Sequence, residues 1–486
     1  MPNKDIIFII PTPDVFMKET LGSIPPIGLI YLHNELKRHG FSSVIFDCSK
    51  PGNTYEALKR RIHEDRPLCA GFSFGTETRF DAFGLARRLR RDFPTLQLLA
   101  GGPHPTLADM DTILHVPELD VLIRGEGERT LVALMQRLRD DLPFDDLHGI
   151  TFRRHGQPVR NPDCAPIADL DALDSPYTAR EIIHQYPYFF QDRDGQRHPM
   201  AVIFTGRGCP FKCSFCGTAL FWGRRSRMRS NDNIIAEIKF IIDNYGIHHF
   251  YFLDDTFNLN VKKLRDLLER IITELPPITW LAGVRIDNMT FDLFELMKRA
   301  GCAKVTYGIE SATQELVDEL IQKQIDLNKV PLIEAWLKTL NIDRRCFFII
   351  GLPNETEAQA ENTIRMIEKL GGDTTLSILR IYPGTRIEEI AREKGILRPE
   401  FNWSQFDLSH TYLRKIIGSS PIYIENLSWY QISCYLFKWA NSGQSFFSIW
   451  KQIPKAVIDI RSFGDIKKLF IMGLAFIRVK GRRLFG

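Results

Sequence analysis

The sequence lacks any apolar run of the roughly 20 residues that a membrane-spanning helix needs. It also lacks a secretory signal near its start, where "MPNKDIIFIIPTP" is instead typical of a short strand interrupted by prolines. Cysteine is scarce, and its odd count of nine argues against a disulfide framework. The net charge of +4 is too small to indicate nucleic-acid binding. We therefore expect a globular protein of the reducing cytoplasm, in which clustered thiols bind a metal or act in catalysis.

The first part of the chain alternates strand and helix patterns. Short, almost continuous apolar runs are typical of buried parallel strands, and amphipathic stretches such as 26–40 and 79–93 lie between them. The expected strands are 5–10, 42–48, 68–74, 97–102 and 120–125. This alternation predicts a doubly wound, Rossmann-like α/β domain over residues 1–145, with a ligand site at the carboxyl edge of its sheet.

A second alternating series covers residues 196–400. Six strands are too few for a closed eight-stranded barrel but fit a partial (β/α)6 barrel, whose chemistry belongs at the carboxyl ends of the strands. The expected strands are 198–208, 248–255, 279–287, 304–311, 344–353 and 374–385. Residues 146–195 are the expected linker with a hairpin, and residues 401–486 are expected to form a separate helical region.

The first strand–helix turn lacks the G-x-G-x-x-G fingerprint of a dinucleotide site. Glycines instead follow the fourth and fifth expected strands, where they let a bulky ligand approach the backbone. They are Gly101, Gly102, Gly125 and Gly127. The N-terminal domain is therefore expected to bind a ligand larger than a dinucleotide phosphate.

Three of the nine cysteines lie within eight residues, in "RGCPFKCSFCG". Cys209, Cys213 and Cys216 follow the first strand of the second series, where functional groups are expected. Thiolates suit zinc, copper(I) or iron–sulfur clusters, and a closed zinc site would need a distant ligand such as Cys302 or Cys346. A cubane cluster held by three thiolates leaves one iron open for a substrate or cofactor. We favour this cluster over structural zinc and over plain loop cysteines.

The C-x3-C-x2-C loop, with Phe215 before its last cysteine, resembles the signature of the radical S-adenosylmethionine (SAM) superfamily. Other segments resemble the branch with an N-terminal cobalamin-binding domain: "GGPHPT", "RGEGE", "FLDDTF", "RID", "YGIES", "GLPNET" and "YPGT". The resemblance implies a [4Fe–4S] cluster on Cys209, Cys213 and Cys216. In that superfamily the open iron chelates SAM, and an electron from the cluster cleaves it to methionine and a 5′-deoxyadenosyl radical.

The resemblance and the positions at strand ends together give the expected SAM contacts. Phe215 would shield the bound group from water, and Asp254 would accept from the SAM ammonium group unless it caps the next helix. Glu310 would bond a ribose hydroxyl and Arg285 would bond a carboxylate, unless the two pair with each other. Gly351 would let the adenine approach the fifth strand, unless it only forms a turn.

The resemblance also implies cobalamin at the edge of the N-terminal sheet. The expected contacts are Thr76, Gly101, Gly102, His104, Thr106, Gly125, Glu126 and Gly127. Many cobalamin domains carry D-x-H-x-x-G, but "FDCSKPG" has Asp47 and Gly52 without a histidine. We therefore expect no histidine on cobalt, His104 included, and a weakly coordinated lower face near Thr76. A domain that has lost cobalamin is the alternative.

The C-terminal region is rich in aromatic residues from Trp429 onward, and residues 465–486 combine apolar and basic side chains. A basic, aromatic, amphipathic helix is typical of segments that lie on anionic membranes. The same composition suits a helical cap on the barrel whose cations reach solvent at its rim. Both interpretations stay open, and no recognition motif for nucleic acid accompanies the basic residues.

The expected function is methyl transfer to an unactivated carbon, less readily phosphorus, of a small or apolar substrate. Two SAM molecules would serve, one to methylate cobalamin and one to generate the radical. The alternatives are a radical oxidative cyclase or rearrangement enzyme and, in another class, a non-catalytic iron–sulfur sensor. A methylthiotransferase acting on tRNA would need three further N-terminal cysteines, and only Cys48 and Cys69 are available.

The expected partners follow from this chemistry. An electron donor such as flavodoxin or ferredoxin would reduce the cluster, and the substrate would be a lipid, an isoprenoid or a tetrapyrrole. The expected location is the cytoplasm, with peripheral contact at the inner membrane face if the C-terminal helix binds lipid.

Overall fold

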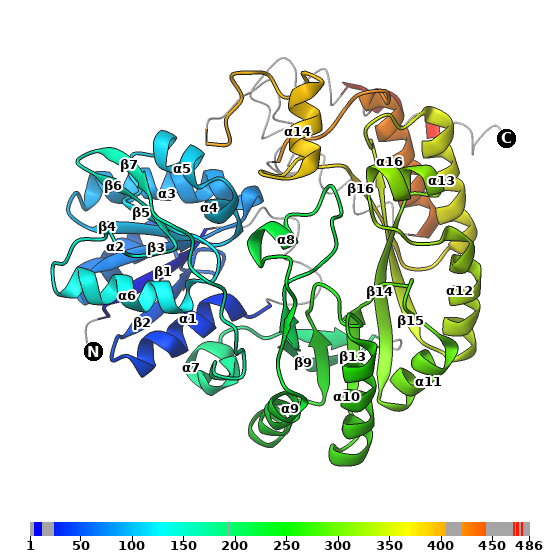
Figure 1. Cartoon of the computed structure of the whole chain (residues 1–486), viewed down its shortest axis with the longest axis horizontal. Coiled ribbons are helices and arrows are strands. Elements are labelled where there is room, and N and C mark those ends of the chain that lie inside the picture. The colour runs from blue at the N-terminus through cyan, green and yellow to red at the C-terminus, as the bar shows by residue number, and fades with distance from the viewer. Residues whose placement is uncertain are drawn as a thin grey trace. The chain divides into compact units, whose positions relative to one another are not determined.

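The computed structural model describes residues 4–11, 24–192, 195–404 and 420–443, together with residues 470, 471, 473–475, 478 and 479. The chain divides into two compact units (Figure 1). The first comprises the described residues of Met1–Gln191, Gly217–Arg227 and Glu400–Phe406. The second comprises those of Asp192–Cys216, Met228–Pro399 and Asp407–Gly486.

The first unit is built on a sheet with the strand order β2-β1-β3-β4-β5-β6-β7. The first five of these strands are parallel, and the hairpin β6–β7 pairs antiparallel with β5. The hairpin that the sequence places in a linker therefore extends this sheet beyond residue 145. The strands are β1 (Ile6–Ile10), β2 (Ser43–Asp47), β3 (Cys69–Ser73), β4 (Gln97–Gly101), β5 (Val121–Ile123), β6 (Ile150–Arg154) and β7 (Gln157–Arg160).

Helices cover both faces of this sheet. Alternate residues of β1 serve two separate cores, because successive side chains of a strand point to opposite faces. Ile7 and Ile9 pack in the core that contains α2, α3 and α5, whereas Ile6 and Phe8 pack in the core that contains α1 and α6. The helices are α1 (Ile27–Arg38), α2 (Tyr55–Asp65), α3 (Arg79–Asp92), α4 (Pro103–Leu107), α5 (Asp109–His115), α6 (Gly127–Arg139), α7 (Arg180–Ile183) and α8 (Thr218–Phe221). The predicted doubly wound fold is confirmed.

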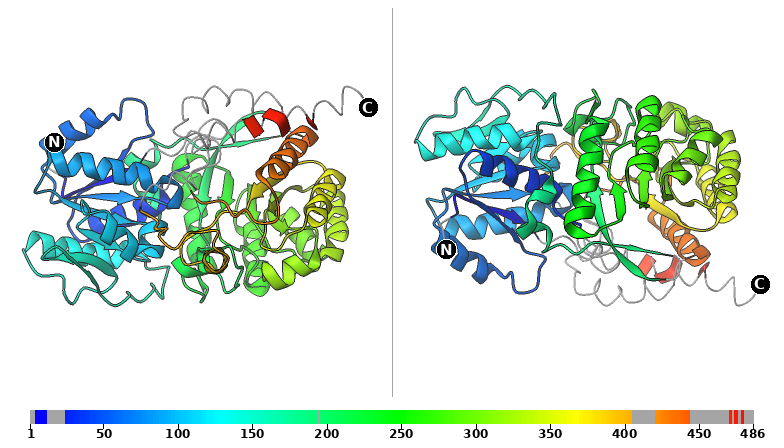
Figure 2. Two further views of the ribbon diagram at one scale, coloured as in Figure 1. Left: turned by 90° about the horizontal axis from the view of Figure 1, so that it is seen from above. Right: turned by 90° about the horizontal axis from the view of Figure 1, so that it is seen from below.

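The second unit contains six parallel strands in the order β16-β15-β14-β13-β12-β9. The six predicted strands of the partial barrel are thus confirmed, and the sheet curls with α10–α13 on one side (Figures 1 and 2). The strands are β9 (Arg197–Ile203), β12 (His249–Phe252), β13 (Thr279–Gly283), β14 (Cys302–Glu310), β15 (Asp343–Ile350) and β16 (Thr374–Ile378). The remaining strands in the described residues are short: β8 (Phe189–Gln191), at the end of the first segment of the first unit, β10 (Gly206–Arg207) and β11 (Arg227–Met228).

Side-chain caps fix where the barrel helices begin, and so how long each strand–helix loop is. Ser230, Asn260 and Thr385 each accept a hydrogen bond from a backbone N–H of the first helical turn. Thr356 and Gln359 form a capping box at the start of α13. The helices are α9 (Asn231–Tyr245), α10 (Val261–Glu274), α11 (Phe291–Arg299), α12 (Val330–Thr339), α13 (Glu357–Leu370), α14 (Arg386–Glu393) and α16 (Trp429–Gly443).

Candidate functional site

The three cysteines predicted to bind the cluster lie on the loop that follows β9. Cys209, Cys213 and Cys216 are half-buried and free of disulfides. Gly208 opens the loop with a φ of +93°, which residues with a side chain rarely adopt. Phe215 is half-buried beside the last cysteine. The loop therefore presents all three thiols at the carboxyl edge of the barrel sheet.

The middle of this loop is anchored through its backbone. The Ser214 N–H donates to the Ile321 carbonyl at 3.0 Å, and the Ser214 carbonyl accepts from the Ile387 N–H at 3.2 Å. The Cys216 N–H donates to the Cys213 carbonyl at 3.1 Å and closes a turn. Two other segments of the same unit thus hold the stretch between the second and third thiols.

The donor set fits a three-thiolate cluster. In the part of the chain that the structure describes, no three His, Cys, Asp or Glu side chains converge on a point that one metal ion could occupy. Thiolates of a cubane bind different irons, so they need not converge. Cys302 begins β14 at the amino edge of the sheet, and the sulfur of buried Cys346 lies 3.9 Å from the Glu334 carboxylate. Neither supplies the fourth zinc ligand that the alternative needs.

Asp254, the predicted partner of the SAM ammonium group, shapes the start of the cysteine loop. Its Oδ1 accepts from the backbone N–H groups of Thr205 at 2.7 Å and Gly206 at 3.0 Å, and its Oδ2 accepts from the Thr205 hydroxyl at 2.5 Å. Burial raises the pKa of Asp254 to about 6 against these hydrogen bonds. Asn260, and not an aspartate, caps the next helix. The carboxylate therefore ties the end of β12 to the end of β9.

Arg285, the predicted partner of the SAM carboxylate, is buried and engaged within the protein. Its Nε lies 3.0 Å from Asp287 Oδ1, and its Nη2 lies 3.2 Å from Asp287 Oδ2 and donates to the Lys323 carbonyl. Its guanidinium carbon lies 3.5 Å from the centre of the Phe211 ring in the cysteine loop. The ion pair is made with Asp287, and not with Glu310 as the alternative interpretation required.

Glu310, the predicted ribose contact, forms an ion pair with Lys323. The Lys323 ammonium lies 2.6 Å from Glu310 Oε1 and donates to the Gly308 carbonyl at 2.8 Å. Both side chains are about nine-tenths buried. Glu310 has a φ of +70°, an unusual backbone angle of the kind that gathers at functional sites.

Lys323 is a residue that sequence reasoning missed. It follows a π-helical turn, Leu316–Leu320, and lies between Gln322 and Gln324, whose φ angles are +58° and +57°. Glutamine has no special preference for that region, so nothing in the local sequence signals this bend. Burial raises the pKa of the Cys213 thiol, and the nearby cations of Lys323 and Arg285 only partly oppose that rise. Both charges therefore act on a predicted cluster ligand.

Gly351 forms a tight turn after β15, with a φ of +82°. Buried Glu355 holds this turn, because its Oε2 accepts from the backbone N–H groups of Gly351 at 2.7 Å and Leu352 at 3.1 Å. Its Oε1 is buried without a hydrogen-bond partner among the described residues, and burial raises the pKa of Glu355 to about 7. An added Cβ at Gly351 would lie 3.2 Å from the Tyr423 carbonyl.

At the carboxyl edge of the first sheet, the four predicted glycine contacts of cobalamin differ in how much space surrounds them. Gly102 needs to be glycine, because its φ is +98° and a Cβ would lie 3.0 Å from the Phe74 carbonyl. Gly125 has a φ of +67°, and a Cβ there would meet nothing within 4 Å, so its outer side is open. In contrast, a Cβ at Gly127 would meet the Leu32 side chain at 3.3 Å, so Gly127 serves helix packing. Gly101 borders the backbone of Ile123.

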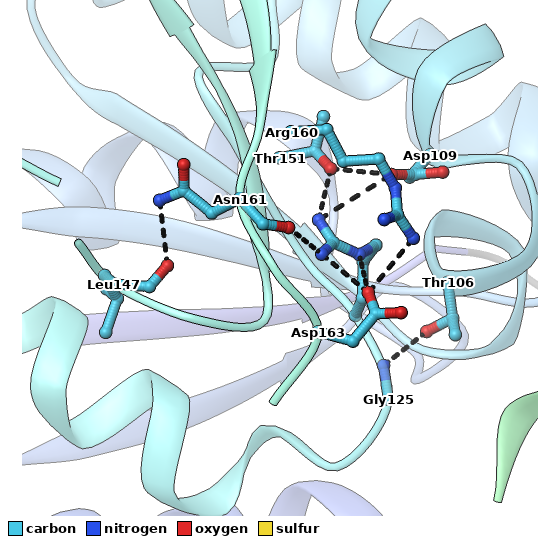
Figure 3. Close-up of polar contacts among 9 residues, drawn as sticks. Thr106, Asp109, Gly125, Leu147, Thr151, Arg160, Asn161 and Asp163 are labelled. Atoms are coloured by element: carbon cyan, nitrogen blue, oxygen red, sulfur yellow. Dashed lines mark hydrogen bonds and ion pairs between the residues drawn. The ribbon is translucent and has the colours of Figure 1, made fainter. Parts of the chain in front are cut away.

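Thr106 joins the two glycine loops. Its hydroxyl donates to the Gly102 carbonyl at 2.8 Å. The same hydroxyl accepts from the Gly125 N–H at 3.0 Å (Figure 3). Behind it, buried Arg124 pairs with Asp163 at 2.7 Å and lies 3.7 Å from Asp109. This network fixes the backbone that precedes Gly125.

His104 and Thr76 lie together at this edge. Fully buried His104 shares a hydrogen bond of 3.1 Å between its Nδ1 and the Thr76 hydroxyl, and its Nε2 has no hydrogen-bond partner in the described chain. Burial and the nearby Arg79 cation lower the pKa of His104 well below its ordinary value. The rings of Phe74 and Trp403 lie about 6 Å away. His104 is thus a neutral imidazole in an aromatic setting.

Glu126, another predicted cobalamin contact, is occupied within the unit. Its Oε2 accepts from the Ile167 N–H at 2.6 Å, and its Oε1 lies 2.7 Å from the Arg227 guanidinium. The part of this edge that fits a bulky ligand is therefore the open backbone at Gly125, because the His104 ring is fully buried.

In the C-terminal region, aromatic residues of α16 are largely buried: Trp429, Tyr435 and Phe437. Most of 465–486 lies outside the described residues. Within it, Ala475 is buried, Phe470 is 67% exposed, and the Arg478 cation lies 5.6 Å from the centre of the Tyr430 ring. None of the described helices combines the length and the apolar character needed to cross a bilayer.

Comparisons with known proteins place the two units in one family. The family model of the radical SAM superfamily matches residues 203–367, and that of the B12 binding domain matches residues 13–135. An uncharacterized methyltransferase of Pyrococcus horikoshii is 30% identical over 403 residues, which cover 82% of this chain and 86% of the relative. The chain belongs to the radical SAM superfamily, in the branch that also carries a B12 binding domain.

Two more distant similarities agree with this assignment. An anaerobic magnesium-protoporphyrin IX monomethyl ester cyclase of Cereibacter sphaeroides is 27% identical over 369 residues, 74% of this chain and 59% of the cyclase. The fold matches that of the radical SAM methyltransferase TsrM from Kitasatospora setae with a TM-score of 0.68 at 16% identity, over 89% of this chain and 88% of TsrM. The protein is an enzyme of the cobalamin-dependent radical SAM methyltransferase family, and the predicted cofactors, a [4Fe–4S] cluster, SAM and cobalamin, are confirmed.

Proposed function

We propose that the protein transfers a methyl group from SAM, through cobalamin, to an unactivated carbon of a small or apolar substrate. The observation that carries this proposal is the 30% identity to a methyltransferase across both domains. One SAM molecule supplies the methyl group, and a second supplies the radical that removes hydrogen from the substrate. The cofactors provide this chemistry, and the protein binds, orients and shields them.

Within the second unit, each side chain has a distinct task. Cys209, Cys213 and Cys216 hold the cluster, and Phe215 shields it. Asp254 sets the path of the loop into these cysteines through its three hydrogen bonds. Glu310 accepts a ribose hydroxyl of SAM. Lys323, which pairs with Glu310 in this structure, would supply a positive charge for the carboxylate of the same ligand.

Within the first unit, cobalamin lies against the open backbone at Gly125 and the loop of Gly102, which Thr106 holds together. We propose that no histidine binds cobalt, because the Nδ1 of His104 already bonds Thr76 and its ring is enclosed. Paramagnetic resonance of the protein loaded with cob(II)alamin would then show no nitrogen splitting from an axial ligand. A splitting that disappears in His104→Ala would reverse this assignment.

We also propose a substrate class, an electron donor and a location for the protein. The proposed substrate is a lipid, an isoprenoid or a tetrapyrrole, and the similarity to a magnesium-protoporphyrin cyclase supports the last of these. Flavodoxin or ferredoxin is the proposed electron donor. Free thiols at all nine cysteines suit a reducing cytoplasm. We also propose that the tail contacts an anionic membrane, in which the exposed Phe470 side chain would be buried. Co-sedimentation with anionic and neutral vesicles tests that contact, and absence of vesicle binding excludes it.

The alternative function is that of a radical cyclase, which the similarity to a magnesium-protoporphyrin cyclase supports. Transfer of an isotope label from SAM distinguishes methylation from cyclisation. The anaerobically reconstituted enzyme receives reductant, methyl-deuterated SAM and an extract from cells that lack the gene. Methylation predicts a product that carries the deuterated methyl group, with S-adenosylhomocysteine and 5′-deoxyadenosine formed in equal amounts. A cyclase forms 5′-deoxyadenosine with no label in the product. A sensor forms neither.

A further inference from the structure

Asn258 fixes the backbone of Arg285. The Asn258 side chain is fully buried and meets Arg285 in both directions: its Nδ2 donates to the Arg285 carbonyl at 2.7 Å, and its Oδ1 accepts from the Arg285 N–H at 2.9 Å. An amide satisfies a backbone donor and acceptor in this way, whereas a carboxylate can only accept. Asn258 therefore joins the loops after β12 and β13. It also fixes the Arg285 backbone, and with it the direction of the Arg285 side chain.

The Arg285 side chain uses its hydrogen-bond donors on groups within the protein. One edge of the guanidinium meets the Asp287 carboxylate, and Nη2 also donates to the Lys323 carbonyl. Asp287 supplies the counter-charge, so the guanidinium has little free charge to offer an external carboxylate. Its flat face remains, and that face lies 3.5 Å from the centre of the Phe211 ring.

Phe211 belongs to the stretch that separates two predicted cluster ligands. It lies two residues after Cys209 and two before Cys213. A buried cation stacked on an aromatic ring contributes up to about 2 kcal/mol. Ser214 is anchored by Ile321 and Ile387, and Asp254 holds the chain before the loop. The stacked ring is a further contact, made by the stretch between Cys209 and Cys213.

We propose that Arg285 is a positioning residue for the iron–sulfur loop, acting through Phe211 and held by Asn258, and is not the partner of the SAM carboxylate. The proposal rests on the family assignment and on the cysteine ligands, and not on methyl transfer. It gives Asn258 a part in cluster retention that its place in the sequence, after "FLDDTF", does not reveal.

Iron retention and SAM affinity separate the two roles of Arg285. The holoenzyme is reconstituted anaerobically as wild type and as Arg285→Met, Arg285→Lys, Phe211→Leu and Asn258→Asp. Loss of iron to a chelator is followed by absorbance, and SAM affinity is measured from the change that SAM causes in the paramagnetic resonance of the reduced cluster. Phe291→Leu, which alters a ring of α11 that is 37% exposed, is the matched control.

We expect Arg285→Met, Phe211→Leu and Asn258→Asp to lose iron about five- to thirty-fold faster than wild type, the range that a contact of about 1–2 kcal/mol implies. Arg285→Lys, which keeps a cation over the ring, should restore most of the retention, with SAM affinity close to wild type. The double variant Arg285→Met/Phe211→Leu should be no worse than either single variant, because both remove one contact. Wild-type iron retention in Arg285→Met overturns the proposal. So does a loss of SAM affinity of about ten-fold or more in Arg285→Lys.

Discussion

The outermost loops at the carboxyl edges of the two parallel sheets are held by different groups, although an ion pair of buried Arg124 with Asp163 lies behind the first edge. At the edge of the first sheet, the loops rely on glycine backbone, at Gly102 and Gly125, and a neutral hydroxyl, that of Thr106, joins them. At the edge of the barrel sheet, the loops rely on charged side chains that hold one another, as in Glu310 with Lys323. The first arrangement leaves open backbone for a bulky ligand. The second keeps charges poised beside the cysteine loop.

The difference predicts different sensitivities. A backbone edge is damaged by added atoms, because a new side chain meets main-chain atoms or the ligand. A charged edge is damaged by removed atoms, because the abandoned partner stays buried and unpaired, which costs more than the contact itself contributed.

The largest expected effect comes from the thiols themselves. Changing Cys209, Cys213 and Cys216 together to Ala should abolish binding of the about four irons expected per chain, and with it SAM cleavage. Iron analysis and absorbance after anaerobic reconstitution measure this. Cys48→Ala, at a half-buried cysteine of the first unit, is the control and should keep its iron. Iron that remains in the triple variant would show that other ligands hold the cluster.

The second effect concerns the buried ion pair. Lys323→Met leaves the Glu310 carboxylate unpaired and should lower the free energy of unfolding by about 3–5 kcal/mol. The double variant Lys323→Met/Glu310→Gln should recover much of that stability, because neither buried charge remains. SAM binding should stay weak in both, since the proposed ribose and carboxylate contacts are lost. Denaturation curves and SAM titration test this, and wild-type SAM affinity in the double variant would refute the proposed contacts.

A third comparison sets two glycines of the first sheet against each other. Gly102→Ala should cost about 1–3 kcal/mol, because its backbone angle is reserved for glycine and its Cβ would press on the Phe74 carbonyl. Gly125→Ala should cost only about 1 kcal/mol, because its Cβ meets open space. That open space is where we place cobalamin, so Gly125→Ala should nevertheless weaken corrinoid binding. Thermal unfolding measures the stability of the two variants, and corrinoid titration measures their affinity. Unchanged corrinoid binding in Gly125→Ala would show that cobalamin does not lie against Gly125.

The sequence predicts the framework of both units because hydrophobic periodicity and glycine positions are local signals. Buried runs such as 5–10 and 97–102 become β1 and β4, and the six strands of the barrel are found in order. The cysteine loop is likewise predictable, because the spacing of its three cysteines is a feature of the sequence alone. Gly127 shows the limit of that logic, since a glycine at a strand end can serve packing as well as a ligand.

Charged residues at strand ends are harder, because their partners come from distant segments. Nothing near Glu310 in the sequence indicates Lys323, which reaches it only through a π-helical turn and two residues with positive φ. Glu126 could not be assigned to Arg227 for the same reason, as about 100 residues separate them. The place of a charged residue at the end of a strand was predictable, and the group it meets was not.

The last expected effect, and the one that sharpens the comparison most, is a pH dependence that one carboxyl introduces at the barrel edge. The Gly351 turn is held by the Glu355 carboxylate, whereas the glycine loops of the first sheet are held by the Thr106 hydroxyl, which does not titrate. Burial raises the pKa of Glu355 from an ordinary 4.5 to about 7. Between these values the folded state binds more protons than the unfolded state, so this carboxyl makes the free energy of unfolding fall as pH rises.

Glu355→Gln should remove that dependence, because the amide oxygen still accepts from the Gly351 and Leu352 N–H groups and no buried charge forms. The variant should lie close to wild type near pH 5 and gain about 2–3 kcal/mol relative to it by pH 8. Thermal unfolding of both proteins from pH 5 to pH 8 measures the difference, in which all other titrating groups cancel. Glu357→Gln, at the exposed start of α13, is the matched control and should follow wild type throughout. Parallel curves for Glu355→Gln and wild type would mean that Glu355 is already ionised at pH 5, and that the charge of this turn is compensated by a partner other than its two backbone donors.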